Sequence, residues 1–583
     1  MATRVLIRCD GGKVRELGTG HVARCLAIAG DLKRSGAAPL FLMSSAGDEA
    51  RVLVERVRSA GFEVAEKREE SSEQENLLKV ASDHQTEVVF LDNLGQSGSS
   101  ISALQRAGFV VVSMDDPDNP ARSDLSINPA FWGCGASVEG FGFTILTALA
   151  GEAPGSQVPH PLRSGVIASF GGYDPGGFAE LFIGAWAFLQ TEETGILAVS
   201  SSHANLATLR EAAKEHEGLT LLTDAPLLDL FPTAALAVCN GGTTMLMAAA
   251  LGAPTLAVSQ YDHQRDSAVR LASLGGARFL GGAGEVSSES LAHGMANILK
   301  DKGLQASLSH GGRCALPGQG RQSVVQRVRF FETLPWDSEF FGFGIATLHG
   351  GFLTRRILNL ALRHAEKEQI ACLYFLASDK DQETFALADG NGFRWVDERL
   401  TFSLSQVASR MGAGASEAPG IRKAQLADLP FLGETAGNAY EFSRYFFDGN
   451  FPRELCQNFY RDWIQKSVTG EFDDIVFVAE VAGEVAGYVS CRKASSNLGQ
   501  IGLVGIAEGF RGQGLGAQLI QRALQWFEEE DLPRVEVVTQ GRNLPAQKLY
   551  RAAGFVLEKS ERWYHKWFPE HHTPSMDSEQ PSE

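Results

Sequence analysis

Short apolar runs rich in β-branched residues alternate with longer alanine- and leucine-rich runs along the N-terminal half of the chain, and this alternation restricts the fold most. RVLIRCD precedes HVARCLAIAGDLKRSG, and APLFLMSS precedes DEARVLVERVRSAG. A short, continuously apolar run is typical of a strand buried on both faces, whereas the longer runs have helical length. Their regular alternation predicts an α/β fold with parallel sheets.

Three composition breaks divide the chain. The Gly/Pro-rich stretch Leu149–His160 interrupts the alternation, which restarts with GVIASFGGYDP and ALAVCNGG. We therefore expect two facing Rossmann-like halves with a cleft between them. Gly303–Gln322 and Ser409–Gly420 are also rich in small residues, and a polar tail follows Trp567. The expected parts are the two halves at 1–152 and 160–325, a third part at 330–410, a fourth at 420–568 and a disordered tail at 569–583.

Charge and cysteine usage exclude several classes of function. The net charge of −18 argues against binding to nucleic acid. No apolar run reaches about 18 residues, so no membrane insertion is expected. The eight cysteines form no CxxC pair, and no metal is expected. The start MATRVLIRCDGG has no signal-peptide pattern, which favours a cytoplasmic protein. A homodimer is left open as its assembly.

One segment reads as strand, glycine loop and helix. In Ile501–Glu529 the loop is Arg511-Gly512-Gln513-Gly514-Leu515-Gly516. Three glycines let the backbone approach a ligand closely, and the free N–H groups that begin a helix favour an anion. This pattern predicts a pyrophosphate site. The alternative is a plain strand–turn–helix whose glycines only serve packing.

The loop resembles the R/Q-x-x-G-x-G/A loop of GNAT acetyltransferases, which binds the pyrophosphate of coenzyme A. Downstream, VEVVTQGRNLPAQKLYRAAGF resembles the next strand and helix of that family, with Asn543 and Tyr550 at its Asn…Tyr positions. The resemblance implies a GNAT fold for 420–568 and acetyl-CoA as a substrate. The residues it implies for acetyl-CoA binding are Val504, Ile506, Arg511, Gly512, Gln513, Gly514, Leu515, Gly516, Asn543 and Tyr550.

The family chemistry gives some of these residues roles. It implies that a backbone N–H near Ile506 binds the thioester carbonyl and that Tyr550 protonates the departing thiolate. The alternative for Tyr550 is a packing residue on a helix face. The general base is not evident, because Glu508 and a water-relayed proton path both remain open.

A second resemblance reaches further back. LPWDSEFFGFGIATL (Leu334–Leu348), EFSRYFFDGNFP (Glu441–Pro452) and WYHKW (Trp563–Trp567) are similar to the dTDP-fucosamine acetyltransferase family. The resemblance makes 330–410 the N-terminal part of the acetyltransferase module. It implies transfer of acetyl to the 4-amino group of a nucleotide-linked 4-amino-4,6-dideoxy sugar. By composition alone, SRYFFD is a packed or sugar-stacking surface.

Polar residues also follow the first predicted strand. Arg8 and Asp10 end that strand, and Gly20 and His21 begin the next helix. Ligands bind beyond the carboxyl ends of strands in open α/β sheets. A helix N-terminus keeps histidine neutral, which suits a general base, and Asp10 is expected to orient the imidazole or to bind a sugar. The alternative is that His21 is a cap or surface residue.

This half resembles the pseudaminic-acid pathway hydrolase of UDP-2,4-diacetamido-2,4,6-trideoxy-β-L-altropyranose, a GT-B-like enzyme that releases UDP. The similar segments are SFGGYDP, NGGTTMLMAAALGAP and GQGRQSVVQRV. The resemblance implies that His21 activates water. The residues it implies for sugar-nucleotide binding are Arg8, Asp10, Gly20, Gly171, Gly172, Asn240, Gly241, Gly242, Thr243, Thr244 and Gln264.

The chain departs from that family at three positions. Leu246 stands where an acid usually binds the ribose, Leu94 replaces a tyrosine, and His263 replaces an asparagine. The leading hypothesis is a bifunctional enzyme that acetylates a nucleotide-linked amino sugar and then releases the nucleotide. The alternatives make the N-terminal half a glycosyltransferase or an inactive sugar-nucleotide-binding module.

Overall fold

The computed structural model describes residues 3–10, 20–92, 98–114, 123–129, 136–145, 163–171, 174–201, 203–379, 381–405 and 420–571. The chain divides into two compact units. One is Met1–Val328 with Ser495–Leu498, and the other is Arg329–Ala494 with Gly499–Glu583. The expected linker at 149–160 and residues 572–583 of the expected tail lie outside the described residues.

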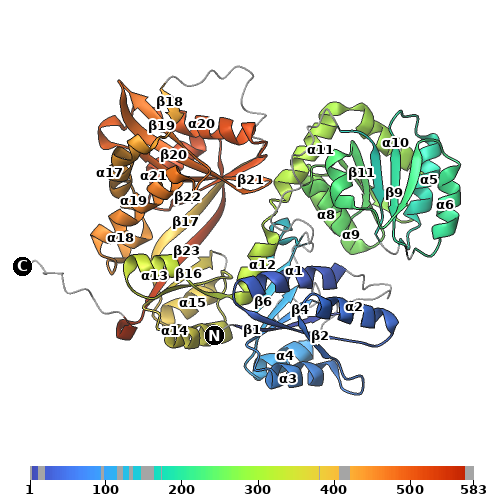
Figure 1. Ribbon diagram of the computed structural model, residues 1–583, viewed down its shortest axis with the longest axis horizontal. Helices are drawn as coiled ribbons and strands as arrows, with labels where there is room; N and C mark the ends of the chain where they lie inside the picture. Colours follow the sequence, from blue (N-terminus) through green and yellow to red (C-terminus); the bar gives the residue numbers. More distant parts are fainter. Residues whose placement is uncertain are drawn as a thin grey trace, which may run out of the picture. The chain divides into compact units, whose positions relative to one another are not determined.

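The first sheet is wholly parallel, and within the described residues its strand order is β3-β2-β1-β4-β5-β6-β7. Helices α1 to α4 flank this sheet (Figure 1). The order reverses between β1 and β4, so their carboxyl ends border the point where ligands bind in such sheets. Alternate strand residues such as Leu6 and Leu91 pack on one face with Leu77 of α3 and Leu104 of α4. The elements are β1 (Arg4–Cys9), α1 (Gly20–Arg34), β2 (Ala38–Met43), α2 (Asp48–Ser59), β3 (Glu63–Glu66), α3 (Glu73–Asp83), β4 (Val88–Asp92), α4 (Gly98–Arg106), β5 (Val110–Met114), β6 (Leu125–Asn128), β7 (Val138–Glu139) and the 3₁₀ turn η2 (Phe141–Phe143).

The second sheet is also wholly parallel, and its described strands have the order β10-β9-β8-β11-β12-β13. Phe182 of α5 and Leu291 of α10 pack on one face, and Met245 of α8 and Leu271 of α9 pack on the other. The elements are β8 (Val166–Ser169), α5 (Phe178–Phe188), β9 (Gly195–Val199), α6 (Leu206–Lys214), β10 (Leu219–Thr223), α7 (Leu227–Leu230), η4 (Phe231–Thr233), β11 (Leu236–Asn240), α8 (Thr243–Ala250), β12 (Thr255–Ser259), α9 (Asp262–Ser273), β13 (Arg278–Gly282), α10 (Ser288–Lys300), α11 (Lys302–Ala315) and α12 (Gly320–Arg329).

The C-terminal unit is built on one mixed sheet, whose described strands have the order β14-β15-β16-β23-β17-β22-β21-β20-β19-β18. Helices α20 and α21 cover one face through Leu519 and Tyr550, and α17 to α19 cover the other through Leu432 and Phe459. The elements are β14 (Phe331–Thr333), α13 (Pro335–Phe341), β15 (Ile345–Leu348), α14 (Arg355–Lys367), β16 (Cys372–Ser378), α15 (Gln382–Gly390), β17 (Arg394–Ser405), β18 (Ile421–Lys423), η5 (Leu426–Asp428), α17 (Leu429–Ala439), α18 (Arg444–Asp448), α19 (Arg453–Thr469), β19 (Ile475–Val481), β20 (Glu484–Ser495), β21 (Leu498–Ile506), η6 (Glu508–Phe510), α20 (Leu515–Glu529), β22 (Arg534–Gln540), α21 (Leu544–Ala552), β23 (Val556–Trp567) and η7 (Pro569–His571).

The expected α/β class is confirmed: two parallel sheets with helices on their faces precede a mixed sheet with helices on both sides. The parts expected at 330–410 and 420–568 contribute strands to the same sheet, because β23 pairs with both β16 and β17. Among the described helices, none is long and apolar enough to cross a membrane.

Candidate functional sites

The glycine loop connects β21 to α20 through the turn η6. Gly512 and Gly514 have φ angles of 79° and 80°, and Gly514 is the N-cap residue of α20. A Cβ atom at either position would meet nothing within 4 Å. These two glycines therefore serve the left-handed backbone conformation, which side chains disfavour, and leave open space above the loop.

The loop presents unbonded donors. Within the described part of the chain, the backbone N–H groups of residues 512–516 make no hydrogen bond. Arg511 and Gln513 are exposed, and Leu515 is buried in the core and anchors the start of α20. Gly516 allows close packing, since a Cβ there would lie 3.4 Å from Leu549. Free N–H groups at the start of a 15-residue helix form a site for an anion.

Tyr550 lies on α21 in the same apolar cluster as Val504, Ile506 and Leu515. Residues expected at the thioester end and at the pyrophosphate end of an acetyl-CoA site thus belong to one apolar cluster. The tyrosine is 4% exposed, and burial raises the pKa of its phenol. Among the described residues, the hydroxyl has no hydrogen-bond partner. A neutral phenol with an uncommitted hydroxyl can donate its proton.

Asn543 and Arg511 have local structural roles, whereas Glu508 faces solvent. Asn543 is the N-cap of α21, where its side-chain oxygen accepts a hydrogen bond from the Ala546 N–H at 3.2 Å. Glu508 is exposed in η6. Arg511 donates from Nε to the Ile506 carbonyl at 3.2 Å and fixes the turn that leads into the loop.

A group of tyrosines that the sequence does not predict lies beside β21. The Tyr440 hydroxyl donates to the Val504 carbonyl at 3.2 Å and lies 3.0 Å from the Tyr488 hydroxyl. The Tyr440 ring stacks on Tyr460, with the ring centroids 4.4 Å apart. Burial raises the pKa of all three phenols. Tyr440 is the C-cap of α17, Tyr460 lies on α19 and Tyr488 lies on β20, so no local sequence pattern connects them.

The segment SRYFFD contains a partly buried cation, Arg444. The guanidinium of Arg444 lies 4.0 Å from the ring centroid of Tyr374 and 4.1 Å from that of Trp563. It donates to the Tyr445 hydroxyl at 2.8 Å and lies 3.1 Å from Nε2 of His565. In the segment expected to form a packed or sugar-stacking surface, the structure thus has aromatic rings packed around the guanidinium of Arg444.

His565 is held neutral within that cluster. Burial lowers its pKa to about 4, and the nearby charge of Arg444 acts in the same direction. Its Nδ1 contacts the carboxylate of Asp448, which also accepts from Trp567 Nε1 at 2.9 Å. This arrangement favours a proton on Nδ1 and leaves Nε2 to accept from Arg444.

In the N-terminal unit, His21 lies on α1 next to the end of β4. Its Nδ1 is 2.9 Å from Oδ1 of Asp92, which is fully buried and also accepts from Arg24 Nε at 2.6 Å. Although burial opposes ionisation, Arg24 and His21 hold the pKa of Asp92 well below its usual range. Arg24 Nη2 also lies 3.1 Å from the same Nδ1, and among the described residues Nε2 of His21 has no hydrogen-bond partner, which leaves Nε2 to a ligand or water.

Within the described residues, no hydrogen bond joins Asp10 to His21. Asp10 accepts from Arg8 Nη2 at 2.6 Å and from the Ser44 N–H at 2.9 Å. Arg8 also donates to Glu73 at 2.5 Å and is 2% exposed, so its guanidinium is engaged within the unit. Gly20 is the first residue of α1.

The second sheet brings other predicted residues together at its carboxyl edge. The side chain of Asn240, at the end of β11, donates to the Phe170 carbonyl at 2.9 Å. A Cβ on Gly171 would lie 3.4 Å from Asn240, and one on Gly241 would clash with the Gln264 carbonyl at 2.1 Å. Gly242 is the N-cap of α8, whose first turn contains Thr243 and Thr244.

Of the positions at which the chain departs from the hydrolase family, one lies in the core and one at the surface. Leu246 is 5% exposed and packs in the core of the second sheet. His263 stacks on Tyr261 at a centroid distance of 5.4 Å. Leu94 and Gly172 lie outside the described residues.

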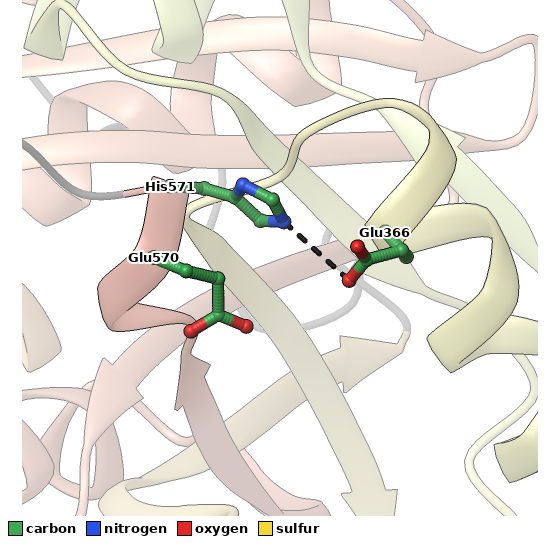
Figure 2. Close-up of side chains that lie close together, drawn as sticks. All are labelled: Glu366, Glu570 and His571. Carbon is green, nitrogen blue, oxygen red and sulfur yellow. Dashed lines mark ion pairs between the residues drawn. The ribbon is translucent and has the colours of Figure 1, made fainter.

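One group of potential metal ligands occurs among the described residues. Glu366 of α14 and Glu570 and His571 of η7 have ligand atoms within 4.8 Å of one another (Figure 2). His571 Nε2 lies 3.6 Å from a Glu366 carboxylate oxygen, and both glutamates are exposed. The arrangement is that of a solvated ion pair, and we assign it no function.

Comparison with known proteins agrees with the C-terminal geometry. Residues 439–555 match the Acetyltransferase (GNAT) family. The dTDP-fucosamine acetyltransferase of Escherichia coli O6:H1 is 29% identical over 236 residues, which cover 40% of this chain and 97% of that protein. The spore coat polysaccharide biosynthesis protein SpsD of Bacillus subtilis is 27% identical over 140 residues, which cover 24% of this chain and 48% of that protein.

A crystal structure of MurG from Acinetobacter baumannii is similar at a TM-score of 0.43 and 15% identity, and covers 56% of this chain and 99% of that one. The family match and the geometry of the loop together assign a GNAT acetyltransferase domain to residues 439–555 of the C-terminal unit.

Proposed function

We propose that the chain transfers acetyl from acetyl-CoA to the 4-amino group of a nucleotide-linked 4-amino-4,6-dideoxy sugar. The observation that carries this proposal is the loop at 511–516. Within the described residues the N–H groups of 512–516 make no hydrogen bond, and Leu515 belongs to the same apolar cluster as Tyr550. The acceptor class comes from the dTDP-fucosamine acetyltransferase, nearly all of which the chain covers. The name of SpsD, a polysaccharide biosynthesis protein, fits the same class.

Different residues bind the coenzyme, stabilise the developing charge and protonate the thiolate. The N–H groups of Gly512 to Gly516 bind the pyrophosphate and fix the coenzyme along β21. Acetyl-CoA supplies an activated acetyl group, and the N–H near Ile506 stabilises negative charge on its carbonyl oxygen. Tyr550 keeps its proton until a thiolate forms, because burial raises the pKa of the phenol.

Aromatic side chains suit the acceptor. The rings of Tyr440 and Tyr460 lie next to β21, and Trp563 and Arg444 form a further aromatic and cationic surface. Apolar faces of sugar rings pack on aromatic side chains, and a guanidinium binds hydroxyl or phosphate oxygens.

The transferase is tested by incubating the full chain with acetyl-CoA and nucleotide-linked amino sugars. Mass spectrometry should detect one acetyl group on a 4-amino-4,6-dideoxy sugar nucleotide and none on its 4-hydroxy counterpart. Acetylation of simple amines or peptides, without any acetylation of the amino sugars, would contradict the proposal.

For the N-terminal unit we propose hydrolytic release of UDP from the acetylated sugar nucleotide, as in pseudaminic-type sugar biosynthesis. A specific observation favours this activity: the buried carboxylate of Asp92 holds Nδ1 of His21. A histidine so oriented can take a proton from water through Nε2. The helix start at Gly242 and the turn at Gly171 supply backbone N–H groups suited to the leaving diphosphate.

UDP release from acetylated sugar nucleotides, with and without an acceptor sugar, tests this second activity. We expect release without acceptor, its loss in His21→Asn and its retention in the matched variant His84→Asn, a partly exposed histidine of the same unit. Release only with acceptor would make the unit a glycosyltransferase. Binding without release would make it a sugar-nucleotide-binding module.

A further inference from the structure

Acetyl transfer to an amine needs a group that accepts a proton, because an ammonium ion has no lone pair with which to attack a thioester. Tyr550 cannot serve at that stage, since it must hold its own proton for the thiolate. The exposed Glu508 offers only a solvated carboxylate. A third carboxylate of the C-terminal unit, Asp397, is placed differently.

Asp397 lies on β17, where the pairing with β23 shifts in register between Trp395 and Asp397. Its side chain is 5% exposed. Such an irregularity in a strand redirects a side chain and is frequent next to active sites. The carboxylate is therefore set below the surface of the sheet rather than in open solvent.

Within the described part of the chain, hydrogen-bond donors reach one oxygen of this carboxylate. Oδ1 accepts from the Glu398 N–H at 2.9 Å and from Arg542 Nη1 at 3.2 Å. The same Nη1 also donates to the Val396 carbonyl at 2.8 Å, so Arg542 is shared between two acceptors. Within the described residues, Oδ2 accepts no hydrogen bond. A nearly buried carboxylate oxygen without a donor is costly, and an N–H group of a ligand would relieve that cost.

The surroundings connect Asp397 to the acetyl-transfer end of β21. Burial, with a smaller contribution from the charge of Asp397, raises the pKa of Tyr460 of α19, and Tyr460 stacks on Tyr440. Tyr440 in turn donates to the Val504 carbonyl, two residues before the end of β21. Asp397 is thus in electrostatic range of the aromatic residues that border the expected thioester position.

We propose, on the basis of the acetyltransferase function above, that Oδ2 of Asp397 binds the acceptor's ammonium group and takes the proton that it loses before attack. The nitrogen lone pair then forms the C–N bond with the thioester carbonyl carbon. The C–S bond breaks, its electron pair stays on sulfur, and Tyr550 protonates the thiolate. The second proton leaving nitrogen restores Tyr550, and Asp397 releases the first proton to solvent.

The electrostatics of the site agree with this role. Burial raises the pKa of Asp397 to about 7, against the lowering charges of Arg542 and Arg444 and with a raising contribution from Glu398. An ordinary aspartate, with a pKa near 4, is a weak base toward an ammonium ion. A carboxylate that titrates near neutrality is both ionised and basic at the working pH.

The test compares Asp397→Asn with wild type in acetylation of the amino sugar nucleotide across pH 5.5 to 9. The matched control is Asp389→Asn, which makes the same change at an exposed position of α15. We expect kcat/KM of Asp397→Asn to fall by roughly 10²–10⁴-fold at pH 7.5 and the control to resemble wild type. Acetyl-CoA affinity should stay unchanged, which verifies the fold of the variant.

The pH profile distinguishes a base from a merely structural residue. Wild type should lose activity below about pH 7, and Asp397→Asn should keep only the titration of the substrate amine. Arg542→Met should move the wild-type midpoint to higher pH, because the charge that lowers the pKa of Asp397 is removed. If Asp397→Asn kept the wild-type rate and profile, the inference would be refuted while the acetyltransferase function stood. If wild type acetylated no amino sugar, both would fall.

Discussion

The two substitutions Gly514→Asp and Gly514→Asn isolate the charge preference of the glycine loop. Gly514 has a φ of 80°, and a Cβ atom there would contact nothing within 4 Å. Both variants therefore bear the same cost of about 1–2 kcal/mol for a left-handed conformation, which Asn and Asp tolerate best. The two side chains have nearly the same shape, so a difference between the variants reports on charge.

The expected difference follows from Coulomb's law. A carboxylate about 4 Å from one pyrophosphate charge is repelled by about 1 kcal/mol in bulk water and by about 4 kcal/mol at the effective dielectric of a protein surface. Gly514 is exposed, and the true value lies between these limits. The affinity of Gly514→Asp for acetyl-CoA should thus be roughly 5-fold to 10³-fold below that of Gly514→Asn.

Isothermal titration calorimetry with acetyl-CoA measures both affinities. The gap between the variants should narrow as the salt concentration rises, because salt screens exposed charges. Dephosphorylated pantetheine fragments, which lack the pyrophosphate, should not distinguish the variants. Equal affinities of the Asp and Asn variants for acetyl-CoA at low salt would mean that no pyrophosphate lies at the loop.

Three further outcomes are expected. Tyr550→Phe should lower acetylation by roughly 10²–10⁴-fold and leave the melting temperature unchanged, since only an unbonded hydroxyl is removed; full activity would reduce the residue to packing. Asp92→Asn should abolish nucleotide release and cost about 3–5 kcal/mol in urea unfolding, because the substitution removes the buried negative charge that pairs with Arg24; unchanged stability would refute that account. Asp397→Asn should be as stable as wild type near pH 4 and increasingly more stable than wild type up to pH 7, by at most about 4 kcal/mol. The reason is that the pKa of Asp397 is raised to about 7 in the folded state, so that its ionisation destabilises the wild-type fold. Thermal melts that give the same difference at every pH would contradict this account.

The features that the sequence predicted depend on local backbone physics. The glycines of the 511–516 loop are diagnostic because a left-handed turn before a helix can be recognised within six residues. The alternation of strand and helix runs predicted parallel sheets for the same reason, since it depends on the periodicity of each segment. Gly171, Asn240 and Gln264 met at one sheet edge because parallel strands place their carboxyl ends together.

The features that could not be predicted from the sequence depend on contacts between residues that are far apart in it. Closeness in sequence suggests Asp10 as a partner of His21 or as a sugar ligand, whereas the sheet places Asp92, 71 residues away, next to the imidazole. The pairing of β1 with β4 sets that neighbour, and no short motif encodes it. Tyr440 and Tyr460 similarly meet only through the packing of α17 on α19.

Asp92 and Asp397 show why residue type and burial do not predict the chemistry of a carboxylate. Both lie on strands and are nearly inaccessible. Arg24 engages both oxygens of Asp92 and His21 adds a further contact, so the pKa of that carboxyl falls although burial opposes it. Arg542 engages one oxygen of Asp397 through a donor shared with a carbonyl, so burial prevails and the pKa rises to about 7. The first carboxylate keeps a fixed charge and suits the orientation of a histidine, whereas the second exchanges a proton near neutrality and suits the deprotonation of an amine.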